Sequence, residues 1–190
     1  PYVKEINIQE ISPIEFEHKM VLKRSGQTLK INYSDRGTVQ FPFGTDLDIS
    51  KGLIITVPMD WECDSLEIDT AAAEVVINDL TIREFDFDGA SGRCVLENCW
   101  IGDVDLDTAS GDILLSGGVM NVDCDAASAS CTLILKNTPK SIEMDTASGD
   151  IEFEGTLNRL DCDAASASCA KMRSFIASVS LVAAIAAVSS

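Results

Sequence analysis

Basic side chains are scarce in this sequence. Its 190 residues include 14 lysines and arginines against 31 aspartates and glutamates, which gives a formal net charge of −17. Proteins bind phosphate backbones through clustered Lys and Arg, so this balance excludes nucleic acid as an expected partner. An acidic surface attracts cations or basic proteins, although self-repulsion that keeps the chain in solution is the simpler interpretation.

Residues that commonly serve catalysis are also few. The single histidine, His18, lies outside the repeats described below, so a Ser–His or Cys–His relay has no second candidate. One serine position recurs in five repeats, which favours a structural row of hydroxyls over a nucleophile. Only Trp61 and Trp100 are available to stack on a sugar. We therefore expect no enzyme, and a polysaccharide-active β-helix is the least favoured hypothesis.

A tandem repeat of about nineteen residues fills much of the chain. It is marked by six aspartates whose successive spacings are 19, 19, 18, 20 and 18 residues. Self-similarity at a fixed period near twenty residues is typical of a stacked architecture. The repeat aspartates are Asp69, Asp88, Asp107, Asp125, Asp145 and Asp163.

Apolar and acidic residues alternate around each of these aspartates. The residue before it and the sixth residue after it are apolar in every repeat, as are Leu106 and Ile113 around Asp107. Such alternation predicts short strands with one buried face, and the Gly, Ala and Ser between them are typical of turns where a glycine permits positive φ. One unit is too small to bury its own apolar face, so the units must stack.

These patterns predict an all-β fold, a single-stranded β-solenoid of six to seven coils of roughly 19 residues. We expect a right-handed β-helix, because parallel crossover connections usually have that hand. Residues 1–60 are expected to form short antiparallel strands that cap the first coil, with a turn at residues 25–27. Residues 61–174 are the solenoid repeats, and residues 175–190 are an apolar terminal coil or cap.

The repeat aspartates, and a second acidic residue two positions before each of them, are expected on the outside of the coils. We expect the aspartates to accept hydrogen bonds from N–H groups of the following turn, an Asx-type role that is structural. A row of Ca²⁺ sites is the alternative, because Ca²⁺ prefers carboxylate and carbonyl oxygens. The chain contains neither an EF-hand loop nor a Gly-Gly-x-Gly-x-Asp repeat, so we expect no cofactor.

Seven cysteines occur, and their repeat positions matter more than their number. Cys94, Cys131 and Cys169 fall on one inward column about two coils apart, which is too far for a bond between them. Cys124 and Cys131 flank one turn, and Cys162 and Cys169 flank another. Each pair closes into a disulfide if its Cβ atoms face each other. We favour free thiols that act as small hydrophobic side chains, because equivalent positions hold Leu, Met and Ile.

The chain ends in an apolar segment that is shorter than the roughly 20 residues of a membrane span, so no transmembrane helix is expected. Val182 follows Asp163 by 19 residues and takes the aspartate position of a seventh coil. An open apolar coil is an exposed strand edge, so we expect a second copy of the chain to cover it, with a helical cap or lipid-facing tail as the alternative. The candidate assembly surface is Val179, Leu181, Val182, Ile185 and Val188.

Two repeats resemble those of a bacterial family described as adhesins, a domain of unknown function with repeats of the form I-x-I-x-T-x-S-G-D-I. The matching stretches are residues 106–113 and 144–151, and the opening is similar at residues 6–8, 26–31 and 55–58. The resemblance covers roughly residues 1–171 and implies a single-stranded β-helix with a surface or envelope-associated role and no agreed catalytic residues. The chain departs from the family pattern where Cys-Asp-Ala-Ala-Ser-Ala-Ser-Cys replaces the glycine turn.

Three hypotheses for the function result. The first is a non-catalytic, adhesin-like scaffold at the cell envelope or surface that binds a protein or glycan through its acidic face or its end coils. The second is a cytoplasmic module that forms homo-oligomers through the apolar terminal coil, which fits the reducing compartment that buried free thiols favour. The third is the polysaccharide-active enzyme.

Overall fold

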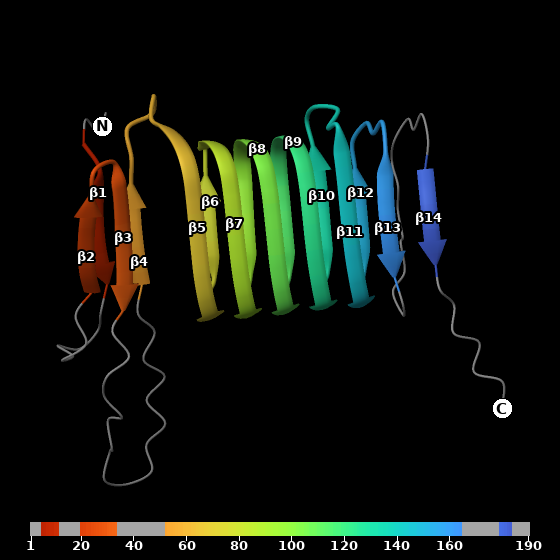
Figure 1. Cartoon of the computed structure of the whole chain (residues 1–190), viewed down its shortest axis with the longest axis horizontal. Coiled ribbons are helices and arrows are strands. Elements are labelled where there is room, and N and C mark those ends of the chain that lie inside the picture. Colours follow the sequence, from red (N-terminus) through yellow and green to blue (C-terminus); the bar gives the residue numbers. More distant parts are fainter. Residues whose placement is uncertain (1–4, 12–19, 34–51, 165–178, 184–190) are drawn as a thin grey trace, which may run out of the picture. The chain divides into compact units, whose positions relative to one another are not determined.

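The computed structural model describes residues 5–11, 20–33, 52–164 and 179–183, and every element in these ranges is a β-strand (Figure 1). The chain divides into two compact units, Pro1–Met59 and Asp60–Ser190. The all-β prediction is confirmed.

The first unit contains two antiparallel strand pairs. Strand β1 (Asn7–Ile11) pairs with β4 (Gly52–Thr56), and β2 (Met20–Ser25) pairs with β3 (Thr28–Tyr33). Gly26 has a φ of 62° in the turn between β2 and β3, a conformation that glycine adopts without a Cβ clash. The predicted antiparallel strands and the turn at residues 25–27 are therefore present.

The second unit is a β-solenoid in which strands of successive coils pair in parallel. Five coils are complete in the described part, and β13 and β14 begin the next two. The strands are β5 (Glu62–Ala72), β6 (Val75–Asn78), β7 (Thr81–Ser91), β8 (Cys94–Ser110), β9 (Ile113–Ser128), β10 (Cys131–Leu135), β11 (Ser141–Ser148), β12 (Ile151–Glu154), β13 (Leu160–Ala164) and β14 (Val179–Ala183).

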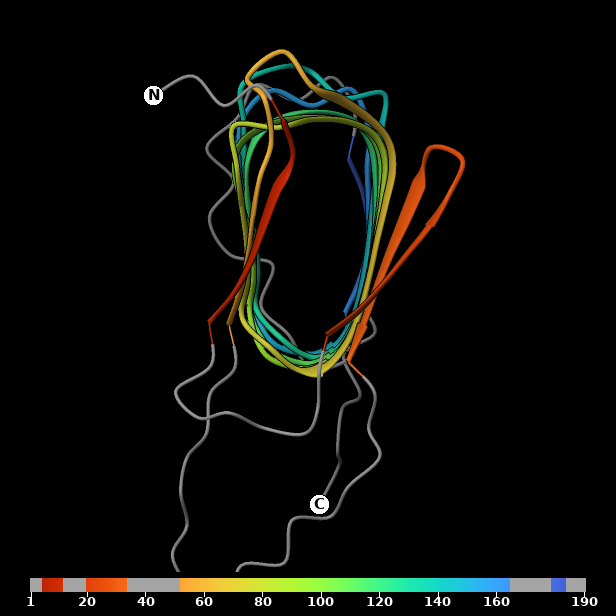
Figure 2. The same cartoon turned by 90° about the vertical axis from the view of Figure 1, so that its left-hand side faces the viewer.

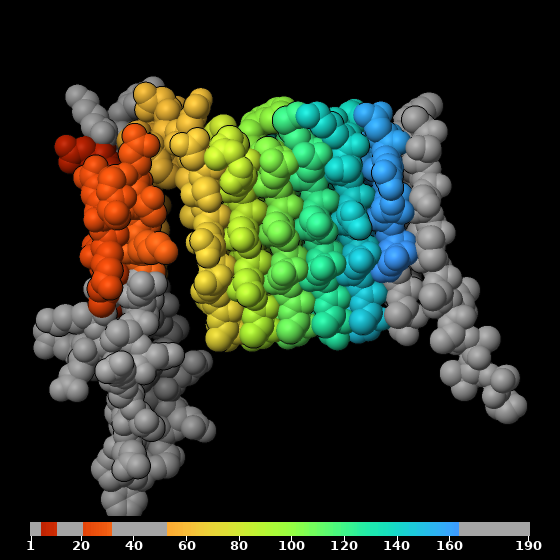
Figure 3. Space-filling model, in the orientation of Figure 1, coloured from red at the N-terminus to blue at the C-terminus, as the bar shows by residue number. Residues whose placement is uncertain are grey.

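Seen along the solenoid axis, the coils superimpose as an elongated outline with two long walls (Figure 2). We call one the acidic wall; it consists of β5, β7, residues 100–110 of β8, residues 119–128 of β9, β11 and β13. The opposite wall consists of β6, residues 94–97 of β8, residues 113–117 of β9, β10 and β12. In the space-filling view, side chains of adjacent coils touch and form rows across the coils (Figure 3).

The interior is built from the two predicted apolar columns. Leu106 on the acidic wall and Leu133 on the opposite wall are each 0% exposed. Full burial of such a side chain contributes about 1.5–3 kcal/mol relative to exposure. The residues before the repeat aspartates that are fully buried are Phe87, Leu106, Cys124, Met144 and Cys162, and those six positions after are Cys94, Ile113, Cys131 and Ile151.

Glycines let the chain pass from the acidic wall to the opposite wall. Gly92, Gly111 and Gly149 occupy the turns of three coils with φ between 126° and 137°. A Cβ added to Gly111 would lie 1.7 Å from the carbonyl oxygen of Gly92, so stacking requires glycine there. The corresponding turn of the fourth coil carries Ala129, which is buried and has no positive φ.

Side chains also join coils at the turn that returns to the acidic wall. The Asn137 side chain donates to the Val119 carbonyl at 2.6 Å and accepts from the Val119 N–H at 2.9 Å. Nearby, the ring of Trp100 lies against Gly118 of the next coil, where an added Cβ would be 2.6 Å from the ring. The indole remains 56% exposed.

Candidate functional site

The acidic wall carries two parallel columns of carboxylates on its outer surface. The strand register stacks each repeat aspartate on its counterpart in the next coil, and the acidic residues two positions earlier stack in the same way. Neighbouring strands lie about 4.8 Å apart, which sets the spacing within a column. The first column is Asp69, Asp88, Asp107, Asp125, Asp145 and Asp163; the second is Glu67, Asp86, Asp105, Asp123, Glu143 and Asp161.

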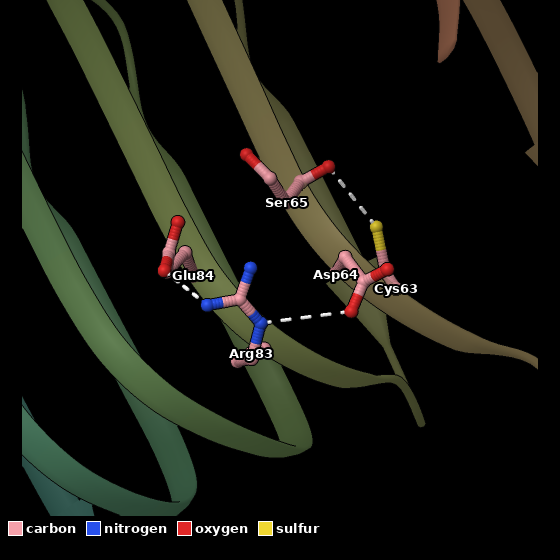
Figure 4. A network of polar contacts seen from close by, with 5 residues as sticks. All are labelled: Cys63, Asp64, Ser65, Arg83 and Glu84. Atoms are coloured by element: carbon pink, nitrogen blue, oxygen red, sulfur yellow. Dashed lines mark hydrogen bonds and ion pairs between the residues drawn. The ribbon is translucent and has the colours of Figure 1, made fainter. Parts of the chain in front are cut away.

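Few cations neutralise these columns. Among the residues that the structure describes, Arg159 forms the only ion pair with either column, through Asp161 at 2.7 Å. Arg83 lies at the edge of the wall, where it contacts Glu84 and reaches Asp64 of the preceding coil at 3.5 Å (Figure 4). The wall is therefore a surface of largely uncompensated negative charge.

Both columns line shallow grooves. Five aspartates of the first column, from Asp88 to Asp163, line one groove with the alanines that follow them in the described coils. Period-two alternation turns the aspartate and the alanine two residues later outward, and alanine leaves space beside the carboxylate. Ala90, Ala109, Ala127 and Ala147 are exposed there. A second, more polar groove follows the other column and includes Asp103, Asn121 and Ser141.

Crowding changes the acidity of several carboxyl groups. The pKa values of Asp105, Asp107, Asp123 and Asp145 are all raised above 3.8, first because partial burial penalises the charged form and second because neighbouring carboxylates repel it. Asp105, for example, faces Asp86 and Asp123 in its own column. A positively charged partner would relieve this repulsion.

For the repeat aspartates from Asp69 to Asp145, no described hydrogen bond comes from the following turn, where Asx-type contacts were expected; the turn after Asp163 lies outside the described residues. Within the described ranges, no three His, Cys, Asp or Glu side chains are grouped to hold a metal ion, and the carboxylates face solvent as a row.

The recurring serines form hydrogen bonds between coils of the solenoid. Ser91 donates to the Ala71 carbonyl at 3.0 Å, and Ser110 donates to the Ala90 carbonyl at 3.3 Å, each in the preceding coil. Ser128 and Ser148 lie 3.0 Å apart through their hydroxyl oxygens. The same position holds Ser166, which lies outside the described residues, as does His18.

The described cysteines are all buried thiols. Burial raises the pKa of Cys94 to about 12, which keeps this thiol protonated and unreactive. The sulfurs of Cys124 and Cys131 lie 3.1 Å apart. The sequence shows that the two cysteines flank one turn. It does not show that their sulfurs point toward each other, because this depends on side-chain direction inside the coil.

The start of the predicted seventh coil is present. Strand β14 pairs in parallel with β13, and the register places Leu181 opposite Cys162 and Val182 opposite Asp163. Of the candidate assembly surface, Val179, Leu181 and Val182 belong to β14, while Ile185 and Val188 lie outside the described residues. The described part of the chain contains no helix long and apolar enough to cross a membrane.

Comparison with known proteins places these observations in a family. The searches of curated proteins and of solved structures each returned no significant match. A family model described as Toastrack DUF4097, a domain of unknown function, matches residues 6–175, which include the whole of the five complete coils. The chain therefore belongs to the Toastrack DUF4097 family.

Proposed function

We propose that this chain is a non-catalytic, adhesin-like scaffold of the cell envelope or surface, and that its acidic wall binds a protein partner through basic side chains. The observation that carries the proposal is the pair of carboxylate columns, which continues through six successive coils with one described ion pair.

Three properties of the wall support a basic protein as the partner. Its strands form a regular parallel sheet, so the carboxylates are held at fixed spacing and lose little conformational freedom on binding. Partial burial, and after it repulsion by neighbouring carboxylates, raises the pKa values of four wall aspartates, so a cationic partner would stabilise their charged forms. The grooves give extended Lys or Arg side chains a place to lie against Ala109 and Ala127.

Calorimetric titration with decalysine tests this function. In the wall variant, Asp105→Asn, Asp107→Asn and Asp123→Asn together remove three negative charges from the centre of the two columns. The control variant Glu74→Gln, Glu97→Gln and Glu154→Gln removes the same charge from exposed residues of the opposite wall and its turns. We expect the wall variant to lose at least about tenfold in affinity and the control less than about twofold.

Equal losses in both variants would show that only net charge attracts the peptide, and the acidic wall would then not be a binding surface. Absence of binding to the unmodified chain at low salt would also contradict the proposal. Fractionation of cells that express the full-length gene tests the location, and recovery with cytoplasmic proteins would contradict an envelope role.

A second candidate function is self-assembly through the terminal coil. The register of β14 places Ser180 opposite Asp161 and Val182 opposite Asp163, so both acidic columns end at this strand. Charge on an edge strand normally opposes edge-to-edge pairing, and its loss here favours contact with a second copy. Light-scattering mass should then rise with concentration for the intact chain but not for a chain that ends at Ser174. If both the intact and the shortened chain are monomers at every concentration, self-assembly through the terminal coil is excluded.

A further inference from the structure

The fourth coil holds two thiols face to face in its interior. Cys124 belongs to the inner column of the acidic wall in β9, and Cys131 begins β10 on the opposite wall. They are 1% and 2% exposed, and their Sγ atoms lie 3.1 Å apart. A disulfide has sulfurs about 2.05 Å apart, so closure requires a movement of roughly 1 Å.

We propose that Cys124 and Cys131 form a redox pair that closes into an intramolecular disulfide across the turn of the fourth coil. The bond would tie the acidic wall to the opposite wall at this coil. This inference is independent of the proposed function, since it concerns the interior of the solenoid and not its outer surface.

The thiols of Cys63, Cys94 and Cys99 have different surroundings. Cys94 and Cys131 belong to one column, but Ile113 of the intervening coil separates them. The Cys99 thiol approaches the carbonyl oxygens of Ile77 and Glu97 at 3.6 and 3.5 Å, and the Cys63 thiol donates to the carbonyl oxygen of Ser65 at 3.2 Å (Figure 4). Among these thiol contacts, the Cys63 and Cys99 sulfurs approach carbonyl oxygens, whereas the Cys124 and Cys131 sulfurs approach each other.

Packing does not require cysteine at these two positions. The equivalent residues of the third coil are Leu106 and Ile113, which are buried in the same columns. The fifth coil has Met144 and Ile151 at the same positions. Two adjacent coils therefore fill this space with ordinary apolar side chains, and the fourth coil places two reactive atoms there instead.

The oxidant in the proposed step is a small-molecule disulfide such as oxidised glutathione. The two sulfurs share one hydrogen bond in which either can be the donor, so either thiol can lose its proton and attack first. The first thiolate attacks one glutathione sulfur, forms a mixed disulfide and releases the first glutathione thiol. The other cysteine then loses its proton and attacks the protein sulfur of the mixed disulfide, which releases the second. Two protein thiols are oxidised and one glutathione disulfide is reduced to two thiols.

Because both sulfurs are buried, exchange needs an opened coil or a chain that is still folding. The test therefore refolds the full chain in glutathione buffers of graded redox ratio. The background variant carries Cys162→Met and Cys169→Ile, which copies the side chains of the fifth coil and removes the second cysteine pair of the same spacing. Free thiols are alkylated, and the intact mass is measured.

We expect the folded chain to lose two hydrogens, a mass decrease of about 2 Da, with two fewer alkylated thiols. Proteolytic cleavage of the chain on the N-terminal side of Asp125 places Cys124 and Cys131 on different peptides. The disulfide should then hold these two peptides together until it is reduced. The redox buffer is described by the square of the reduced glutathione concentration divided by the oxidised glutathione concentration. At half-oxidation of the cysteine pair, this ratio should be at least about tenfold higher for the folded chain than for the same chain in denaturant.

A matched variant separates the bond from a general effect of oxidation. Cys124→Leu with Cys131→Ile copies the third coil, and its melting temperature should be equal under oxidising and reducing conditions. The background chain should melt higher when oxidised. Equal half-oxidation ratios for the folded and the denatured chain, or a bond between other cysteines, would overturn the proposal.

Discussion

The two walls of the solenoid share one kind of interior and differ in their exteriors. Both bury an apolar column, represented by Leu106 on the acidic wall and Leu115 on the opposite wall. Outside, the acidic wall repeats Asp or Glu in two columns at six coils. Stacked positions on the other side of the opposite wall's strands change chemical type along the solenoid, from the exposed Val76 and the covered Val95 to Leu114, Thr132 and Glu152.

This difference shows which side chains the solenoid fold requires and which it only tolerates. The opposite wall shows that a coil can stack with an aliphatic, hydroxyl or carboxylate side chain outside, as long as the inner column remains apolar. On the acidic wall, partial burial and then repulsion by neighbouring carboxylates raise the pKa values of Asp105 and Asp107, so the charged forms of both are disfavoured. Stacking alone therefore does not account for them, and this supports a binding role.

The largest expected effect comes from breaking the shared interior. Leu106→Ala and Leu115→Ala should each lower the free energy of unfolding by about 2–5 kcal/mol, because each leaves a cavity in a closely packed column. Asp107→Ala, one residue from Leu106 but facing outward, should change it by no more than about 0.5 kcal/mol. Urea denaturation measures all three. A small cost for either leucine would show that the two walls do not contribute alike.

A smaller loss is expected where the chain crosses from one wall to the other. Gly111→Ala should cost about 1–3 kcal/mol, since alanine resists a φ of 137° and its Cβ meets the Gly92 carbonyl. Ser110→Ala is the control, because this exposed neighbour loses a single hydrogen bond to the Ala90 carbonyl. Thermal unfolding of both variants makes the comparison, and a neutral Gly111→Ala would mean that the coil spacing relaxes.

The smallest effect is a gain. The wall variant of Asp105, Asp107 and Asp123 should melt a few °C higher than the natural chain at pH 7, since it removes carboxylates whose charged forms are disfavoured by partial burial and by mutual repulsion. Raised pKa values mean that the folded chain binds more protons than the unfolded chain as pH falls toward 3.8. The three aspartates therefore make the natural chain more stable at lower pH within that range.

Melting curves at pH 7 and pH 4.5 check the sign. The difference between the two pH values should shrink in the wall variant and persist in the opposite-wall control of Glu74, Glu97 and Glu154. If the opposite-wall control reduces the difference in melting temperature by the same amount, charge repulsion is spread over the whole surface and is not concentrated on the acidic wall.

The sequence alone was sufficient to predict the features that depend on the repeat period and on the alignment of successive repeats. Alternation around Asp107 identified the inward Leu106 and Ile113, and the spacing from Asp163 placed Val182 at the start of a seventh coil, as the β14 register confirms. The alanine two positions after each repeat aspartate also recurs in all six units of the sequence, and a residue two positions on faces the same side of a strand, which agrees with the exposed alanines of the described coils.

Other features depend on distances that no local pattern contains. Strand β1 spans Asn7–Ile11 because it pairs with β4, which lies more than forty residues later in the chain. The contact between the Cys124 and Cys131 sulfurs and the ion pair of Arg159 likewise depend on side-chain direction in the folded coil.

The contact of Trp100 with Gly118 has a practical consequence. An indole that rests on the backbone of the next coil is partly shielded from water only while the two coils remain stacked. Its fluorescence should therefore shift to longer wavelength and become easier to quench when they separate. With Trp61→Phe to remove the other emitter, the protein would carry an intrinsic optical probe at one joint of the stack, suited to following where a one-dimensional array first opens.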